Sequence, residues 1–386
     1  MKKKLASILG LALLLTACGN NGSNNSKAEA SADSNEIVIG GIIPKTGAAA
    51  VYGNTTEKGV NLAIEEINEA GGINGKQIKY LSEDDKGDPT EAVTVYNKLS
   101  DAGVQAIIGP VTSKPAQAVA DNSVEDNMPI ISPTGTMESI TEGKDNVFRA
   151  CFTDPLQGEI LANFAANNLE AKKVAVLRNT SNDYSNGVAD KFKEVAKAQG
   201  LEVVADEGYG ENDVDFKVQL TNIKKQSPDV ILVPEYYEKD VSIAGQAKEL
   251  EIDAKIIGPD GWDGVLATVA KGSEGNLEGI YFTNHYAVDD ESEKIQSFVK
   301  KYEEKYGEKP SAFAALGYDT VYIYKTAFEN AKSDSREDII QAIKDVEYDG
   351  ITGSLKFGKD NNPVKSAAII EIKDGKYVFD SVVEVK

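Results

Sequence analysis

The sequence predicts an α/β protein made of two doubly wound, Rossmann-like lobes, each with a parallel sheet covered by helices. Three observations lead to this fold class. The chain has 386 residues, more than one ordinary domain needs. Short apolar runs alternate with segments whose apolar residues recur at helical spacing, which is typical of βαβ units. Two such series of similar length follow one another, and no linker rich in Gly, Ser or Pro separates them.

The first series starts at the apolar run Ile37–Ile43, which has the composition of a strand buried on both faces of a sheet. Further along, Asp88-Pro89-Thr90-Glu91 predicts a helix start, because it combines a cap, a proline at the first helical position and an acid at the third. The other elements expected in this series are a helix over 57–70, a strand over 104–108, a helix from Ser113 and a strand over 129–132.

The second series repeats the scheme. Val188, Phe192 and Val195 lie at helical spacing, and Gly200 ends that helix. Strands are expected at 174–177, 201–205, 230–233, 255–257 and 279–283, and two more helices near 216–223 and 240–250.

After His285 the pattern changes to three helices, expected over 291–306, 312–331 and 336–346. Strands are then expected at 354–357, 367–372 and 377–385, with Asp374-Gly375 as a two-residue turn between the last two. Because no linker precedes this tail, we expect it to pack back on the first lobe.

The N-terminus has the features of a secretory signal. Three lysines follow Met1, an apolar run extends from Leu5 to Leu15, and small residues precede Cys18. This run is too short to span a bilayer, which needs about 20 residues. Leu15-Thr16-Ala17-Cys18 resembles the bacterial lipobox, and the resemblance implies that a signal peptide of residues 1–17 is removed and that Cys18 carries lipid. Two or more acyl chains would hold the protein stably on a membrane.

Residues 18–35 are predicted to form a lipid-anchored flexible tether. Positions 19–35 contain five Asn, four Ser, three Ala and two Gly, with no large apolar residue to bury. The sequence therefore predicts a folded body attached to the outer face of the membrane by a flexible tether.

Composition excludes several classes of protein. Forty-one basic and 62 acidic residues give a net charge of −21, so nucleic acid is not expected as a partner. With one histidine, His285, a metal site built on a histidine pair is excluded. If Cys18 is lipidated, Cys151 has no partner for a disulfide and is expected to be a small core residue.

No catalytic or cofactor motif is present. The chain has no GxSxG, no P-loop and no GxGxxG after a strand, so we expect neither an enzyme nor a bound cofactor or metal.

Polar residues follow the strands of the first series, at the sheet edge where open α/β sheets bind ligands. Ser113 begins a helix whose free N–H groups can hold an anion. Thr134 and Thr136 flank Gly135, where the backbone can approach a ligand closely. An ordinary helix cap and a plain turn explain the same residues about equally well.

In the second series, Tyr184 and Tyr236 follow two strands and could form aromatic walls with polar tips. Asp260 follows another strand, in Gly258-Pro259-Asp260-Gly261, where it could meet a cation. Surface tyrosines and a simple turn are the alternatives. Taken together, one lobe offers neutral donors and the other a lone acid, a combination that fits a zwitterionic amino acid.

The chain resembles the solute-binding proteins of ABC importers, specifically those for leucine, isoleucine and valine. The resemblance extends from about Ile37 to the C-terminus. It rests on Val51-Tyr52-Gly53, Ile67-Asn68-Glu69-Ala70-Gly71-Gly72-Ile73-Asn74-Gly75, Ile108-Gly109-Pro110, Ile131-Ser132-Pro133 and Phe313-Ala314-Ala315-Leu316-Gly317-Tyr318-Asp319.

The resemblance implies a periplasmic-binding-protein fold of the first type, in which three strands of a hinge cross between the lobes near residues 152, 285 and 358. The first lobe would comprise residues 36–152 and 285–358, and the second lobe residues 153–284 and 359–386. Ligand would close the lobes, and the closed form would dock on a membrane permease.

The resemblance also assigns roles to individual residues. The ligand carboxylate would meet Ser113 and Thr136 together with the backbone at Thr134, and the ligand ammonium would meet Asp260. The walls of the pocket would be Tyr52, Val111, Thr112, Tyr184 and Tyr236. Relatives often carry Glu at the position of Asp260 and Cys at that of Thr112.

The sequence therefore predicts a monomeric, outward-facing receptor, lipid-anchored to the cell membrane, on the extracellular face of a Gram-positive host or in a periplasm. It would bind an L-amino acid, in the first place a branched aliphatic one, and deliver it to an ABC importer. Two alternatives stay open: a receptor of the same fold for an amide, urea or a carboxylate, and a sensor that reports its ligand to a signalling partner.

Overall fold

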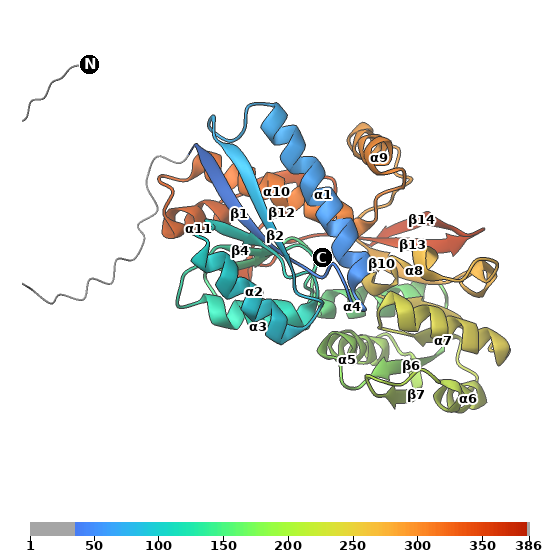
Figure 1. Ribbon diagram of the computed structural model, residues 1–386. Helices are drawn as coiled ribbons and strands as arrows, with labels where there is room; N and C mark the ends of the chain where they lie inside the picture. Colours follow the sequence, from blue (N-terminus) through green and yellow to red (C-terminus); the bar gives the residue numbers. More distant parts are fainter. Residues whose placement is uncertain (1–34, 384–386) are drawn as a thin grey trace, which may run out of the picture. The chain divides into compact units, whose positions relative to one another are not determined.

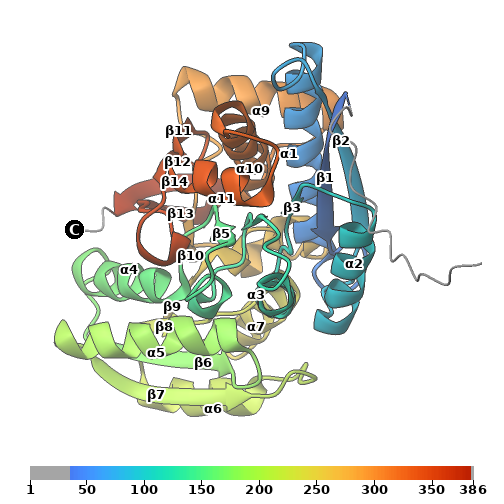
Figure 2. The same cartoon turned by 90° about the vertical axis from the view of Figure 1, so that its left-hand side faces the viewer.

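A computed structural model describes residues 35–383 of the chain. The predicted signal peptide, Cys18 and all but the last residue of the predicted tether lie outside the described residues. Two large sheets organise the fold, one wholly parallel and one parallel except for an antiparallel hairpin at its end (Figures 1 and 2).

The first sheet has the order β2-β1-β3-β4-β5, and all its strand pairs are parallel. Its strands are β1 (Glu36–Ile43), β2 (Gln77–Asp84), β3 (Ala106–Ile108), β4 (Ile130–Ser132) and β5 (Val147–Arg149). Its connecting helices are α1 (Ala50–Glu69), α2 (Pro89–Asp101) and α3 (Ser113–Ser123).

The second sheet has the order β14-β13-β10-β9-β8-β6-β7. The strands from β7 to β10 are parallel, and the hairpin of β13 and β14 extends the sheet in antiparallel fashion beside β10. Its strands are β6 (Lys173–Asn179), β7 (Glu202–Tyr209), β8 (Val230–Leu232), β9 (Lys255–Gly258), β10 (Tyr281–Asn284), β13 (Ala367–Lys373) and β14 (Lys376–Val383). Its helices are α4 (Asp154–Asn167), α5 (Asp183–Ala198), α6 (Lys217–Gln226), α7 (Tyr237–Glu249) and α8 (Val265–Thr268).

The tail after β10 returns to the first sheet, as the sequence predicts. It contains α9 (Glu293–Tyr306), α10 (Ala312–Asn330), α11 (Arg336–Lys344) and a small hairpin of β11 (Glu347–Gly350) and β12 (Gly353–Lys356). We call the first sheet, its helices and this tail the first lobe, and the second sheet with its helices the second lobe.

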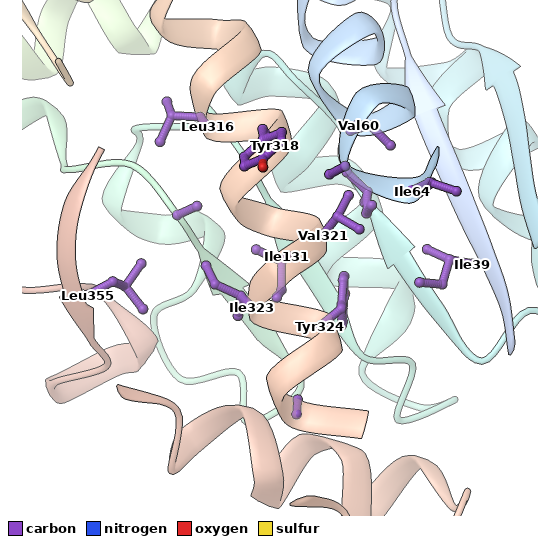
Figure 3. Close-up of a cluster of buried hydrophobic side chains, with 14 of the residues drawn as sticks. Ile39, Val60, Ile64, Ile131, Leu316, Tyr318, Val321, Ile323, Tyr324 and Leu355 are labelled. Carbon is purple, nitrogen blue, oxygen red and sulfur yellow. The ribbon is translucent and has the colours of Figure 1, made fainter. Parts of the chain in front are cut away.

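Apolar side chains on both faces of each sheet build the cores, because alternate residues of a strand point to opposite faces. In the first lobe one face packs on α1 and α10, and the other on α2 and α3. Figure 3 shows the former cluster, in which α10 lies over the sheet and beside α1. Its labelled members are Ile39, Val60, Ile64, Ile131, Leu316, Tyr318, Val321, Ile323, Tyr324 and Leu355.

Some elements differ from the sequence prediction. The helix expected from residue 57 begins at Ala50, and no side chain caps that end, so no local signal marks it. The edge strand β2 has neither a continuous apolar run nor a sustained alternation, because Tyr80-Leu81 breaks the alternation and its last three residues are polar. The strand β5 has three residues, and α4 has no polar face because it is largely buried. Asp88 caps α2 as the sequence predicts, because its side chain accepts hydrogen bonds from the N–H groups of Thr90 and Glu91.

Three segments, 150–153, 285–292 and 358–366, carry the chain between the lobes. They contact one another where they cross. The Phe152 ring stacks on the His285 ring at 3.7 Å, and Lys365 Nζ donates to the Ala150 carbonyl at 3.0 Å. The predicted lobe boundaries fall in or beside these segments and, as exact positions, stay predictions.

The contact between α1 and α10 depends on two glycines. A Cβ on Gly59 would lie 1.9 Å from the Ala314 carbonyl oxygen, and one on Gly317 would lie 2.5 Å from the Thr56 carbonyl oxygen. Each helix therefore approaches the backbone of the other more closely than any side chain allows.

We expect Gly59→Ala to lower the free energy of unfolding by at least ~1–3 kcal/mol, because the added methyl group forces the two helices apart. Urea denaturation, followed by the fluorescence of the single tryptophan Trp262, measures this. Gly275→Ala is the matched control, because a Cβ there meets nothing within 4 Å. Equal unfolding midpoints for the two variants would contradict the packing argument.

Candidate functional site

A small cavity lies between the two lobes, at the carboxyl ends of the strands of both sheets. Phe313 and Gly261 contribute to its lining. The other lining residues are the nine that the sequence singles out: Tyr52, Val111, Thr112, Ser113, Thr134, Thr136, Tyr184, Tyr236 and Asp260. The volume of this cavity is only about 10 Å³. A ligand therefore reaches these residues only when the lobes separate. Their roles in binding stay predictions.

The first-lobe wall of the cavity consists largely of hydroxyl groups and the start of α3. Thr112 holds the N-cap position, and its side chain makes no capping hydrogen bond. Ser113 is the first helical residue, as the sequence predicts, so the alternative interpretation of Ser113 as an ordinary helix cap does not hold. Both residues line the cavity. The unpaired N–H groups of the first helical turn lie beside them and favour an anion.

The loop after β4 carries Thr134 and Thr136, and the buried side chain of Arg149 holds this loop in place. The Arg149 guanidinium donates to the carbonyl oxygens of Gly135 at 2.7 Å and Met137 at 2.8 Å. A guanidinium presents its donors in a fixed fork, so it fixes the loop's backbone as well as neutralising its carbonyl dipoles.

Asp260 lies on the second-lobe side, directly after β9. Its Oδ1 accepts hydrogen bonds from Tyr184 Oη at 2.9 Å and Gln157 Nε2 at 3.0 Å, and its Oδ2 lies 3.2 Å from His285 Nε2. A carboxylate has about four acceptor positions. One position on Oδ2 is therefore left for a further donor.

His285 lies at the second crossing between the lobes and is buried. Burial lowers its pKa, while the hydrogen bond to Asp260 opposes that change. A neutral ring protonated on Nε2 donates to Asp260, and its Nδ1 then has no hydrogen-bond partner among the described residues. The protein groups that donate to Asp260 are thus all neutral.

Aromatic rings form the remaining walls. Tyr52 stacks on Phe313 with ring centroids 4.3 Å apart, and Tyr184 stacks on Tyr236 at 5.0 Å. Tyr52 meets Tyr236 edge to face at 5.6 Å. The two stacked pairs each lie within one lobe, and the Tyr52–Tyr236 contact joins the lobes across the cavity.

The sequence analysis assigned no role to several residues at this site. Phe313 lines the cavity, and Gln157 and His285 hold Asp260. Asp154, the first residue of α4, donates its N–H to the carbonyl oxygen of Thr136 at 3.0 Å. Residues 154 and 157 follow β5 directly, so recognising that three-residue strand would have drawn attention to them.

Other features of the described residues bear on function. Within residues 35–383 no group of three His, Cys, Asp or Glu side chains could hold a metal ion. No helix in this range is both long and apolar enough to cross a membrane. Cys151 is buried with a free thiol, in keeping with a core residue.

A larger cavity, about 570 Å³ by the same measure, lies between α8, the start of α10 and β14. It is lined mainly by apolar side chains and contains none of the nine predicted residues. Its size alone assigns it no ligand.

Comparison with known proteins agrees with this geometry. The periplasmic binding protein family matches residues 36–376. The Leu/Ile/Val-binding protein BraC3 of Rhizobium johnstonii is 32% identical, over 84% of this chain and 88% of its own. A leucine-, isoleucine-, valine-, threonine- and alanine-binding protein of Pseudomonas aeruginosa is 29% identical, over 84% and 86%. The crystal structure of the Streptococcus pneumoniae branched-chain amino acid transporter substrate-binding protein LivJ, with isoleucine, is 36% identical, with a TM-score of 0.85 over 91% of this chain and 100% of that chain.

The fold and the interlobe cavity define a two-lobed extracytoplasmic solute receptor. The chain belongs to the periplasmic binding protein family, whose members are non-enzymatic receptors. It is a solute-binding protein of the kind that serves ABC transporters, and the predicted family resemblance and two-lobe fold are confirmed.

The buried carboxyl of Asp154 makes the stability of the fold depend on pH. Both its carboxylate oxygens are buried without a hydrogen-bond partner among the described residues. Burial raises the pKa of Asp154 well above its ordinary value, and the nearby Thr136 hydroxyl opposes the rise. The folded protein therefore binds this proton more tightly than the unfolded chain does. The resulting stabilisation is full below the unfolded pKa, about 3.9, and is lost as pH rises through the folded pKa.

We expect Asp154→Asn to remove this dependence, so that the variant gains stability relative to wild type as pH rises from about 4. Urea denaturation of the ligand-free protein across pH measures the difference. For Asp145→Asn the stability difference from wild type should vary with pH in the opposite direction, because Lys344 lowers the pKa of that exposed carboxyl. A difference for Asp154→Asn that does not vary with pH would contradict the argument.

Proposed function

We propose that this protein binds an L-amino acid, in the first place leucine, isoleucine or valine, between its closing lobes and delivers it to an ABC importer. One observation carries the proposal: hydroxyl groups and a helix N-terminus on the first lobe face a carboxylate on the second lobe across one small cavity. A ligand with an anion at one end and a cation at the other matches both walls.

The ligand carboxylate would bind at the first lobe. Ser113 offers a hydroxyl, the first turn of α3 offers N–H groups, and Thr134 and Thr136 lie on the loop that Arg149 holds. Neutral donors hold an anion without leaving a buried positive charge unpaired when the site is empty.

The ligand ammonium would bind at the second lobe, at the free acceptor position of Asp260. Three protein donors already fix the position of this carboxylate. An ammonium group would therefore add a charge-assisted hydrogen bond without reorienting the Asp260 side chain. The shorter Asp, where relatives often carry Glu, fits a ligand drawn closer to β9.

The ligand side chain would lie against Val111, Thr112, Tyr52 and Phe313. The named ligands of the Rhizobium and Pseudomonas relatives, and the isoleucine bound to the Streptococcus protein, support a small aliphatic group. The Thr112 hydroxyl adds a polar point to this wall, which would also suit threonine, one of the ligands in the name of the Pseudomonas relative.

The N-terminal features complete the proposal. With lipid on Cys18 and residues 19–35 as a tether, the body would face outward at the membrane beside its permease, as a monomer. Globomycin treatment, or Cys18→Ser, should release the protein from the membrane fraction, whereas a protein that stays bound in both cases would refute the lipid anchor. Loss of amino-acid uptake in a deletion strain distinguishes transport from a sensing role.

We expect leucine, isoleucine and valine to raise the melting temperature of the protein after it has been unfolded and refolded to remove co-purified ligand. Ligand at a hundred times its Kd adds ~2.7 kcal/mol, enough to shift a melt by a few degrees. The panel holds the twenty L-amino acids with urea, short-chain amides and dicarboxylates. Shifts only with the amides or acids would replace the amino-acid proposal with the runner-up.

We expect Asp260→Asn to weaken leucine binding by ~2–5 kcal/mol, because the ammonium loses its charged partner. Isothermal titration calorimetry measures this for leucine and for 4-methylpentanoate, which lacks the ammonium. Asp260→Asn should not lower the affinity for 4-methylpentanoate in the same way. The surface variant Glu249→Gln should leave the affinities for both ligands unchanged. Leucine binding by Asp260→Asn that is as tight as in wild type would refute the proposed pose.

A further inference from the structure

Tyr237 lies next to the binding cavity but does not line it. It is the first residue of α7, in the second lobe, and its side chain is buried. Its hydroxyl donates to the carbonyl oxygen of Ala48 at 2.5 Å and accepts from the N–H of Val51 at 3.3 Å. Ala48 and Val51 lie at the start of α1, in the first lobe. One hydroxyl thus joins two backbone groups of the opposite lobe.

Tyr52 makes the reciprocal contacts from the first lobe. Its hydroxyl donates to the carbonyl oxygen of Gly261 and accepts from the N–H of Tyr237 at 3.1 Å. The two tyrosine rings meet edge to face, with centroids 4.7 Å apart. Each tyrosine therefore satisfies one carbonyl and one N–H of the other lobe; three of these four hydrogen bonds join the starts of α1 and α7, and the fourth reaches Gly261 after β9.

This arrangement exists only while the lobes are closed. All four hydrogen bonds run between the lobes, and their partners are backbone groups with fixed positions in each lobe. When the lobes separate to admit ligand, the bonds break together and water replaces them. Tyr237→Phe would lose both functions of the hydroxyl and leave the part-buried Ala48 carbonyl and Val51 N–H without their protein partner in the closed state.

We propose that Tyr237 is a positioning residue that sets ligand affinity without touching the ligand. It stabilises the closed state by joining the start of α7 to backbone groups at the start of α1. This inference rests on the proposed function, since it presumes that ligand binds between the lobes. Because Tyr237 contributes equally whatever the cavity holds, it changes the affinity for all ligands by one factor and leaves the preference among them unchanged.

The test compares Tyr237→Phe with wild type and with Tyr324→Phe, using the purified mature protein. Tyr324 is the matched control: its buried hydroxyl also donates to backbone carbonyls, at Ile107 and Pro129, but both lie inside the first lobe. Calorimetry and stopped-flow fluorescence of Trp262 measure the affinity and dissociation rate of leucine and of the next-best amino acid of the panel. Energy transfer between dyes on Lys98→Cys and Glu249→Cys, exposed residues of the two lobes, reports closure without ligand.

We expect Tyr237→Phe to bind both amino acids about 5- to 30-fold more weakly, by the same factor, mainly through faster dissociation. Tyr324→Phe should melt at a lower temperature and bind with wild-type affinity. Unchanged affinity in Tyr237→Phe, a change in its ligand preference, or an equal loss in Tyr324→Phe would overturn the inference. If wild type binds no amino acid, the proposed function fails, and the ligand-free energy transfer decides: an unchanged closed fraction in Tyr237→Phe overturns the inference as well.

Discussion

Both lobes depend on the three segments in which the chain crosses between the two sheets. Each lobe is completed by a piece of chain that returns after the other lobe has been built: α9–α11 return to the first sheet, and β13–β14 return to the second. At the crossing, Phe152 packs on His285 and Lys365 donates to Ala150. The carboxyl ends of both parallel sheets therefore face one cleft, and the loops that follow their strands become the walls of one site.

The electrostatics of the site follow from burial. Asp260 accepts hydrogen bonds from neutral donors on Tyr184, Gln157 and His285, whereas burial without such partners raises the pKa of Asp154. Two acids in one cleft thus differ in their environments. On the first lobe, the buried Arg149 serves the loop backbone instead of facing a ligand.

Affinity and selectivity belong to different residues in this arrangement. The side chains of Val111, Thr112, Tyr52 and Phe313 line the cavity, whereas the Tyr237 hydroxyl binds backbone groups of the opposite lobe outside it. A contact that depends only on closure adds the same free energy to every ligand that permits closure. A receptor built this way can change its ligand by substitutions in the cavity and still close by the same contacts.

The sequence by itself determined the two alternating series, the return of the tail and the position of polar residues after strands. These properties follow from local periodicity and from the rule that parallel sheets bind ligands at their carboxyl edge. It also drew attention to nine of the eleven residues that line the cavity, partly from their position and partly from family resemblance. It did not reveal β2, β5 or α4, because an edge strand, a three-residue strand and a helix without a polar face lack the usual patterns.

Only the tertiary structure decided which residues meet across the cleft. Asp260 and His285 are 25 residues apart and Tyr52 and Tyr237 are 185 apart, so no local pattern records either contact. Ser113 shows the same limit on a smaller scale: its position at the start of a helix was compatible with an ordinary cap or a binding residue, and the fold places it among the residues that line the cavity. Local sequence sets the conformation of each element, and the packing of distant elements sets what its side chains touch.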